Sequence, residues 1–152
     1  MKKTFLLPSL LLAIGAMWVA PASARNVAYQ ISLAELLKTP EAQAKLDSSV
    51  KFYLSGQTPP AVEQSFGEDH SHRSGIGSVK EEVELATCRA ETLSVLAAFQ
   101  AKAKKLGANA IVDIYSFYKN EVSKNPATIE CHAGTFRIHV VLKATYAKVA
   151  VQ

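Results

Sequence analysis

Two of the four histidines in the chain stand in a His-x-His arrangement within a very polar stretch, residues 67–78. The imidazoles of His70 and His72, with two acidic residues just before them, are suitable ligands for Zn²⁺ or Cu²⁺. In a strand both imidazoles would face the same way, but no spacing assigns a third ligand, whether His132 or His139. We favour a mobile surface loop with two solvated histidines, and treat metal binding by this loop as the alternative.

Cys88 and Cys131 are the only cysteines and the next candidates for chemistry. One disulfide is the simplest interpretation in an oxidising compartment, and closing a loop of about 43 residues would stabilise the fold by roughly 3–4 kcal/mol. The alternatives are a metal pair, or a thiol nucleophile acting with His132 or His139. The absence of a C-x-x-C pair argues against disulfide exchange.

No residue pattern in the chain predicts catalysis. Asp113 interrupts an apolar run, where it could be a reactive acid or, as we favour, could point to solvent or cap a turn. No second carboxylate has a spacing that suggests an acid–base pair. Tyr115, Phe117 and Tyr118 could line a binding face, although aromatic residues on strands mostly belong to a core. The sequence therefore predicts a non-enzymatic protein without a cofactor, unless the histidines hold a metal.

The first 24 residues have the three parts of a secretory signal peptide. Lys2 and Lys3 precede an apolar stretch, Phe5–Val19, and Ala-Ser-Ala at residues 22–24 supplies a cleavage site before Arg25. The alternative, a membrane anchor, is disfavoured because the apolar stretch is short. Removing this leader lowers the formal charge from +4 to +2, which argues against nucleic-acid binding. We expect one domain, residues 25–152, in the periplasm or outside the cell.

Local signals then place the elements that must hold these side chains. Arg25–Ile31 suggests a short edge strand. Ser32 with Glu35 has the pattern of a capping box, and predicts a short helix directly after Ser32. Thr39 followed by Pro40 predicts the start of a second short helix. A longer amphipathic helix begins between Lys80 and Cys88 and ends at Leu106, with Gly107 as its left-handed C-terminal residue.

Four segments have the apolar patterns of strands: Val50–Leu54, Ala61–Phe66, Ala110–Tyr118 and Thr135–Tyr146. The first two should form a hairpin around the Pro-containing turn at residues 56–60. Cys131 lies in the outward phase of the last strand, whereas Cys88 lies on the buried face of the long helix. A disulfide between them requires a shift of phase, and we expect a β-bulge at Gly134. The polar loop Lys119–Thr128 and the histidine stretch are the places where we expect any functional surface.

The order of these features gives the chain a family resemblance. Cys88 opens an amphipathic helix, and K-x-L-G-A-N-A-I-V, a polar loop, E-C-H-A-G and a long alternating strand follow. The chain resembles a family of small secreted proteobacterial proteins often labelled "excinuclease ATPase subunit". It lacks the G-x-x-x-x-G-K-[ST] motif and the zinc-binding cysteine pairs that such a label requires. From Cys88 onward it is similar, more distantly, to the Rcs outer-membrane stress-sensor lipoprotein and to the YbjQ-type domain.

The stress-sensor resemblance implies a compact sheet with one packed helix and a disulfide, which Cys88 and Cys131 match. The sensor's lipid-bearing cysteine and second disulfide have no counterpart here. The YbjQ-type resemblance leaves a homo-oligomer open. We therefore expect an α+β fold, with an antiparallel or mixed sheet of about four strands and the long helix on one face. The expected function is a non-enzymatic binding or interaction module for a periplasmic or envelope protein. The alternative is a metal-binding protein that uses His70 and His72.

Overall fold

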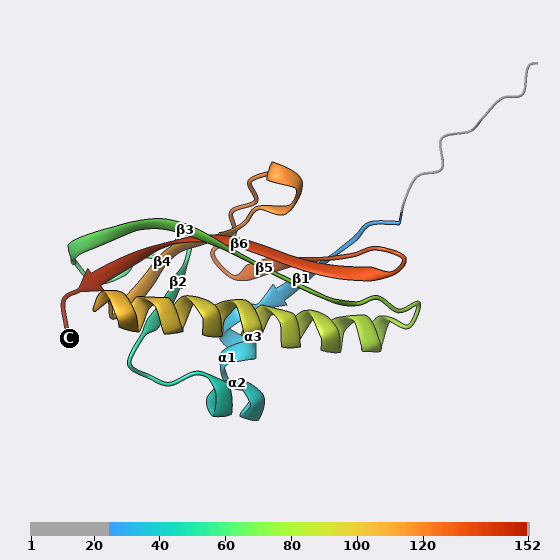
Figure 1. Ribbon diagram of the computed structural model, residues 1–152, viewed down its shortest axis with the longest axis horizontal. Coiled ribbons are helices and arrows are strands. Elements are labelled where there is room, and N and C mark those ends of the chain that lie inside the picture. The colour runs from blue at the N-terminus through green and yellow to red at the C-terminus, as the bar shows by residue number, and fades with distance from the viewer. Residues whose placement is uncertain (1–24, 152) are drawn as a thin grey trace, which may run out of the picture.

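Residues 25–151 are described by the computed structural model, and the predicted leader lies outside them. A mixed sheet of six strands carries one long helix, α3 (Glu81–Leu106), along one of its faces (Figure 1). The remaining elements are β1 (Val27–Ser32), α1 (Leu33–Leu37), α2 (Pro40–Lys45), β2 (Lys51–Leu54), β3 (Val62–Ile76), β4 (Ala110–Ser116), the 3₁₀ turn η1 (Tyr118–Asn120), β5 (Thr128–Ala133) and β6 (Arg137–Val149). The α+β class is confirmed. The expected count of about four strands was wrong, because β1 and β5 extend the sheet.

The long strand β6 is the centre of the sheet. It pairs along one edge with β3, and along its other edge with β5 and, further on, with β4. β1 lies beyond β5 and β2 lies beyond β4; the β2–β4 pair is parallel and the other four pairs are antiparallel. The predicted hairpin of residues 50–54 with 61–66 is therefore wrong, because β2 and β3 lie on opposite sides of β6.

β3 runs through the stretch that the sequence predicted to be a mobile loop. Its antiparallel register with β6 continues to the pair Ile76 and Arg137, so the polar run is a strand at the edge of the sheet. On the face toward α3, Asp69 accepts hydrogen bonds from Lys102 Nζ at 2.7 Å and Tyr146 Oη at 2.8 Å. Polar partners thus replace the apolar contacts that usually identify a buried strand face, and the loop prediction was wrong for this reason.

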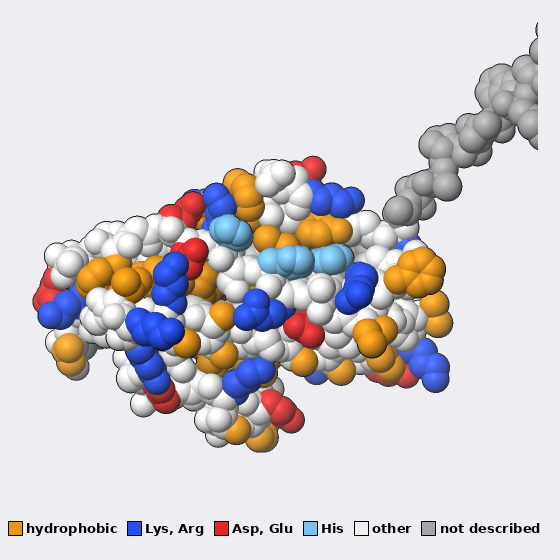
Figure 2. Space-filling model, in the orientation of Figure 1, with side chains coloured by type: hydrophobic (Ala, Val, Ile, Leu, Met, Phe, Trp, Pro, Cys, Tyr) orange, Lys and Arg blue, Asp and Glu red, His pale blue; other side chains and the backbone are white. Residues whose placement is uncertain are grey.

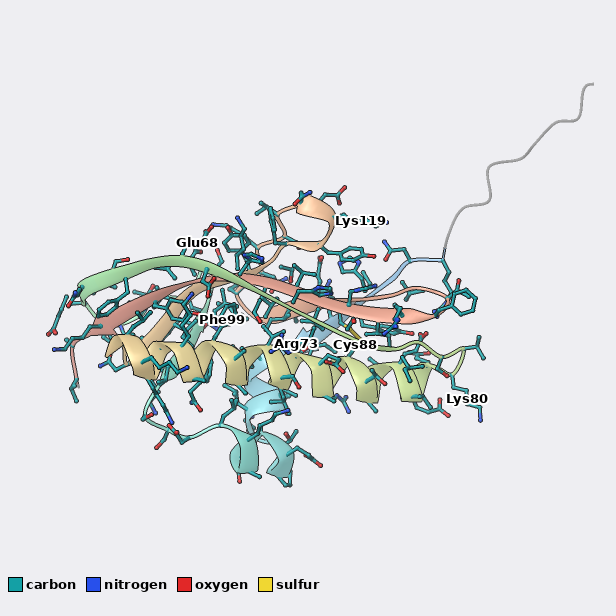
Figure 3. All side chains as sticks on the ribbon, viewed as in Figure 1. Glu68, Arg73, Lys80, Cys88, Phe99 and Lys119 are labelled. Atoms are coloured by element: carbon teal, nitrogen blue, oxygen red, sulfur yellow. A yellow bond between two sulfur atoms is a disulfide. The ribbon has the colours of Figure 1, made fainter. Side chains whose placement is uncertain are left out.

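The core lies between α3 and the sheet. Every second residue of β6 is buried against the helix: Ile138, Val140, Leu142, Ala144 and Tyr146. Phe99 lies between α3 and the sheet (Figure 3). Its ring meets that of Tyr146 edge to face, with centroids 6.1 Å apart. The central apolar stripe of α3 therefore packs on β6, the strand that pairs with β3, β4 and β5.

The disulfide predicted from the sequence ties the helix to β5. The Sγ atoms of Cys88 and Cys131 are 2.05 Å apart, and both residues are completely buried. The expected β-bulge at Gly134 is wrong. Residues 134–136 form a hairpin turn between β5 and β6, so the chain reverses direction and Cys131 faces the helix on a strand of its own.

The predicted helix ends are all present. Ser32 Oγ accepts a hydrogen bond from the Glu35 backbone N–H at 3.3 Å, and Thr39 Oγ1 accepts one from Ala42 N–H at 3.2 Å. Gly107 ends α3 in the left-handed conformation, at φ 76°. These caps fix where the short helices and α3 begin or end relative to the sheet.

Candidate functional site

The face of the sheet that α3 leaves uncovered carries all four histidines of the chain. His70 and His72 lie on β3, His139 lies on the neighbouring strand β6, and His132 lies on β5 beyond it. Figure 2 shows histidine side chains gathered on the molecular surface, beneath the projecting turn that contains η1. The structure thus brings together residues that are far apart in the sequence and that no spacing had linked.

The strand register explains this gathering. His132 is directly opposite His139, and His139 is opposite Ser74, which places His72 on the diagonal. His72 Nε2 and His139 Nδ1 are 3.1 Å apart, and the ring centroids are 5.3 Å apart, so the rings meet edge to edge in one N–H···N hydrogen bond. Burial lowers the pKa of His139, and electrostatic interactions with His72, Arg137 and His132 lower it further.

His132 is held differently from the other three histidines. Its Nδ1 is 3.2 Å from Asn26 Oδ1, and its Nε2 is 3.2 Å from Glu130 Oε2. The ring of Tyr118 stacks on it with a centroid distance of 4.1 Å. Both ring nitrogens of His132 therefore already have oxygen partners, and its ring supports Tyr118.

The turn that follows β4 carries unusual backbone conformations. Lys119 and Asn120 both have positive φ, 53° and 66°, a region that a residue with a long side chain such as lysine rarely occupies. The turn stands out from the open face of the sheet, on the side away from α3 (Figure 3). Such strained residues concentrate at functional sites, where the surrounding structure has to hold them in place.

These elements enclose a shallow depression, here called the histidine hollow, whose lining comes from β3, β6 and the residues just after β4: His70, His72, Phe117, Tyr118, Lys119, Asn120, His139, Val141 and Lys143. The lining contains two lysines and no carboxylate. Lys143 Nζ is 3.2 Å from Glu68 Oε1 at the border of the hollow, and Tyr115 Oη donates to the same carboxylate at 2.8 Å. These hydrogen bonds lower the pKa of Glu68, while burial, with the bond to Glu68, raises the pKa of Tyr115 to about 12.

The structure places the predicted metal ligands in a strand and not in a loop. His70 and His72 share the open face, and His139 contacts His72 from the next strand. Among residues 25–151, no group of three His, Cys, Asp or Glu side chains lies where it could hold a metal ion. His72 thus gains a neighbouring imidazole that sequence spacing did not indicate, whereas His70 lies opposite Lys143.

The other candidate residues divide between the surface and the hollow. Asp113 is exposed and its carboxylate is 3.3 Å from Lys124 Nζ, in agreement with a solvent-facing position. Phe117 and Tyr118 line the hollow, so these aromatic residues belong to the candidate site. The sequence reasoning missed Lys143, although the outward phase of the last strand, shared with His139, was a signal that could have found it.

Comparisons of the chain with protein-family models, with curated proteins and with solved structures each find no match. Within residues 25–151, none of the helices is both long enough and apolar enough to cross a membrane. The assignment of the histidine hollow as the candidate site therefore depends on its geometry alone.

Proposed function

We propose that this protein is a non-enzymatic binding module of the periplasm or the extracellular space, and that its ligand occupies the histidine hollow. The observation that carries the proposal is the convergence of residues from β3, β6 and the strained turn at Lys119 on one open face. The buried disulfide supports an oxidising compartment. The lining offers imidazoles, amines and aromatic rings, which can hold a ligand by hydrogen bonds, charge and stacking.

The partner that we infer is a periplasmic or envelope component. Its identity can be approached by recording amide NMR spectra of the ¹⁵N-labelled protein with periplasmic extract, before and after dialysis of the extract. We expect shift changes confined to the lining of the hollow, and dialysis separates small ligands from macromolecules. The effect should disappear in Lys119→Glu, which reverses one charge of the lining.

Lys105→Glu is the matched control, because it makes the same change of charge on an exposed residue of α3. It should leave the shift changes intact. If the changes map to the helix side of the molecule, or if both variants respond as the wild type does, the hollow is not the binding site.

A further inference from the structure

We propose that the end of the molecule where β3 leads into α3 is a membrane-docking tip, which inserts apolar side chains into the surface of a lipid bilayer. The tip consists of residues 76–83 and of the β5–β6 turn, residues 134–136. None of these residues lines the histidine hollow, so the tip is a second surface, separate from the candidate site.

The tip exposes four large apolar side chains at one end of the molecule. Val79 is 89% exposed, Phe136 is 81% exposed, Ile76 is 79% exposed and Val83 is 45% exposed. Figure 2 shows hydrophobic side chains gathered at this end, on the right, and Figure 3 places Lys80 at the same end. Single exposed apolar residues are common on protein surfaces, but a group of them marks a contact with a partner or a membrane.

The two loops of the tip are held against each other by their backbones. The Gly77 N–H donates to the Phe136 carbonyl at 2.9 Å, and Ile76 pairs with Arg137 at the end of the β3–β6 ladder. A Cβ at residue 77 would lie 2.9 Å from the backbone nitrogen of Arg137, so glycine is the residue that permits this close approach. The apolar side chains of both loops are therefore presented together, at the same end of the sheet.

The place where the predicted leader joins the domain favours a bilayer as the occupant. Arg25, the first residue after the predicted cleavage site, donates to the Gly134 carbonyl of the tip at 3.1 Å. The apolar stretch of the leader ends at Val19, six positions before Arg25, and an extended chain of that length spans at most about 20 Å. While this stretch lies in the membrane during export, the tip is therefore held close to the bilayer.

The size of the tip argues against a protein partner. Its four side chains offer a few hundred Å² of apolar surface, whereas a stable protein interface buries roughly 800 Å² from each partner. Exposed Lys80 and Arg137 bring two positive charges to the tip, and exposed Glu81 and Glu82 bring two negative charges. Docking should therefore depend on apolar insertion, and only weakly on the charge of the lipid.

The test uses the processed protein, which has no tryptophan because the only one, Trp18, lies in the predicted leader. Phe136→Trp thus places a single fluorophore at the tip, and the variant is titrated with phosphatidylcholine vesicles. We expect the emission to move to shorter wavelength, and lipids brominated on their acyl chains to quench it. Vesicles with one quarter phosphatidylglycerol should bind within about threefold of the same affinity, since each unbalanced basic residue would strengthen binding about fivefold.

Val62→Trp is the matched control, because Val62 is 49% exposed and lies at the opposite end of β3. Its emission should stay the same when vesicles are added. In a second measurement, co-sedimentation with the same vesicles, Ile76→Ser and Val79→Ser should each weaken binding about tenfold, since burial of an apolar side chain shifts an equilibrium by one to two powers of ten. Val62→Ser should change it by less than about twofold.

Equal responses from the two tryptophans, or no shift of the Phe136→Trp emission at millimolar lipid, would overturn the proposal. So would an emission that shifts with protein concentration in the absence of lipid, because a second copy of the chain would then cover the tip. Thermal unfolding of each serine variant shows whether a loss of binding reflects a loss of folding. Lys119→Glu, which alters the histidine hollow, should bind vesicles as the wild type does, so the two proposals fail separately.

Discussion

The buried carboxylate of Glu84 gives the most quantitative prediction about the fold. Its side chain is completely buried in the first turns of α3, and Arg25 binds both carboxylate oxygens, at 2.7 and 2.8 Å. Tyr29 Oη donates a third hydrogen bond at 2.7 Å. Arg25 is also the residue that follows the predicted cleavage site, and its guanidinium donates to the Gly134 carbonyl at 3.1 Å. One side chain thus connects the start of the domain to α3 and to the β5–β6 hairpin.

Replacing Arg25 with alanine should destabilise the domain by about 2–4 kcal/mol. Removing one partner of a buried ion pair costs about 3–5 kcal/mol, because the other charge stays buried without compensation. The Arg25 side chain is 33% exposed, so water can replace part of its interaction and the expected loss is about 1 kcal/mol below that range. Glu84→Gln keeps the shape of the side chain and removes the charge, and we expect a smaller loss of about 1–2 kcal/mol.

The pH dependence gives an independent check on the same contact. The hydrogen bonds from Arg25 outweigh burial and hold the pKa of Glu84 at about 2, below its ordinary value of 4.5. Because the folded state lowers this pKa, the stabilisation is complete above about pH 4.5 and is lost as the pH falls toward 2. Wild-type protein should therefore lose more stability across this window than Glu84→Gln does.

Urea denaturation followed by far-ultraviolet circular dichroism, at pH 7, 4.5 and 3, measures both effects. Tyr29→Phe serves as the control, because it removes only the neutral donor and should cost about 1 kcal/mol. Losses below about 0.5 kcal/mol in Arg25→Ala at pH 7, or identical pH profiles for wild type and Glu84→Gln, would refute the reasoning.

Two further predictions test the packing of α3 on the sheet. Replacing Cys88 and Cys131 together with alanine should lower the stability by about 3–4 kcal/mol, since the bond closes a separation of 43 residues, and should make denaturation insensitive to reductant. Gly75→Ala should cost about 1–3 kcal/mol, because the new Cβ would lie 2.4 Å from Thr87 Cγ2. Adding Thr87→Ser, which deletes that methyl group and keeps the hydroxyl that donates to the Val83 carbonyl, should recover most of the loss; additive losses would contradict this explanation.

The features that could be predicted from the sequence are those decided by neighbouring residues. Ser32, Thr39 and Gly107 each act on backbone groups within a few positions, so their side-chain types were enough to place the helix ends. The amphipathic face of α3 was similarly clear, because the burial of Cys88 and Phe99 follows the helical period. The pairing of β2 with β4 could not be predicted this way, because the two strands are far apart in sequence and the fold of the chain between them brings them together.

The missed strand β5 shows a different limit. Its buried residues Ile129, Cys131 and Ala133 alternate as a strand requires, but this pattern runs out of phase with the longer one after it. Treating the two segments as one strand required a bulge at Gly134. The chain instead reverses direction at residues 134–136, and His132 pairs with His139 across two antiparallel strands. Each strand can then turn its own alternate residues toward the helix, so both patterns are satisfied.

Two of the departures from local rules in this chain lie at the histidine hollow, although a third, the positive φ of 50° at Asp113, does not. β3 was missed because one of its faces meets the helix through Asp69 and a bare glycine, while its other face holds His70 and His72. The turn at Lys119 breaks the preference of long side chains for negative φ. Local and global preferences conflict mainly where function constrains the residues, and these two conflicts arise on segments about 45 residues apart in sequence. Both segments line the same depression on the open face of the sheet, which supports the histidine hollow as the candidate site.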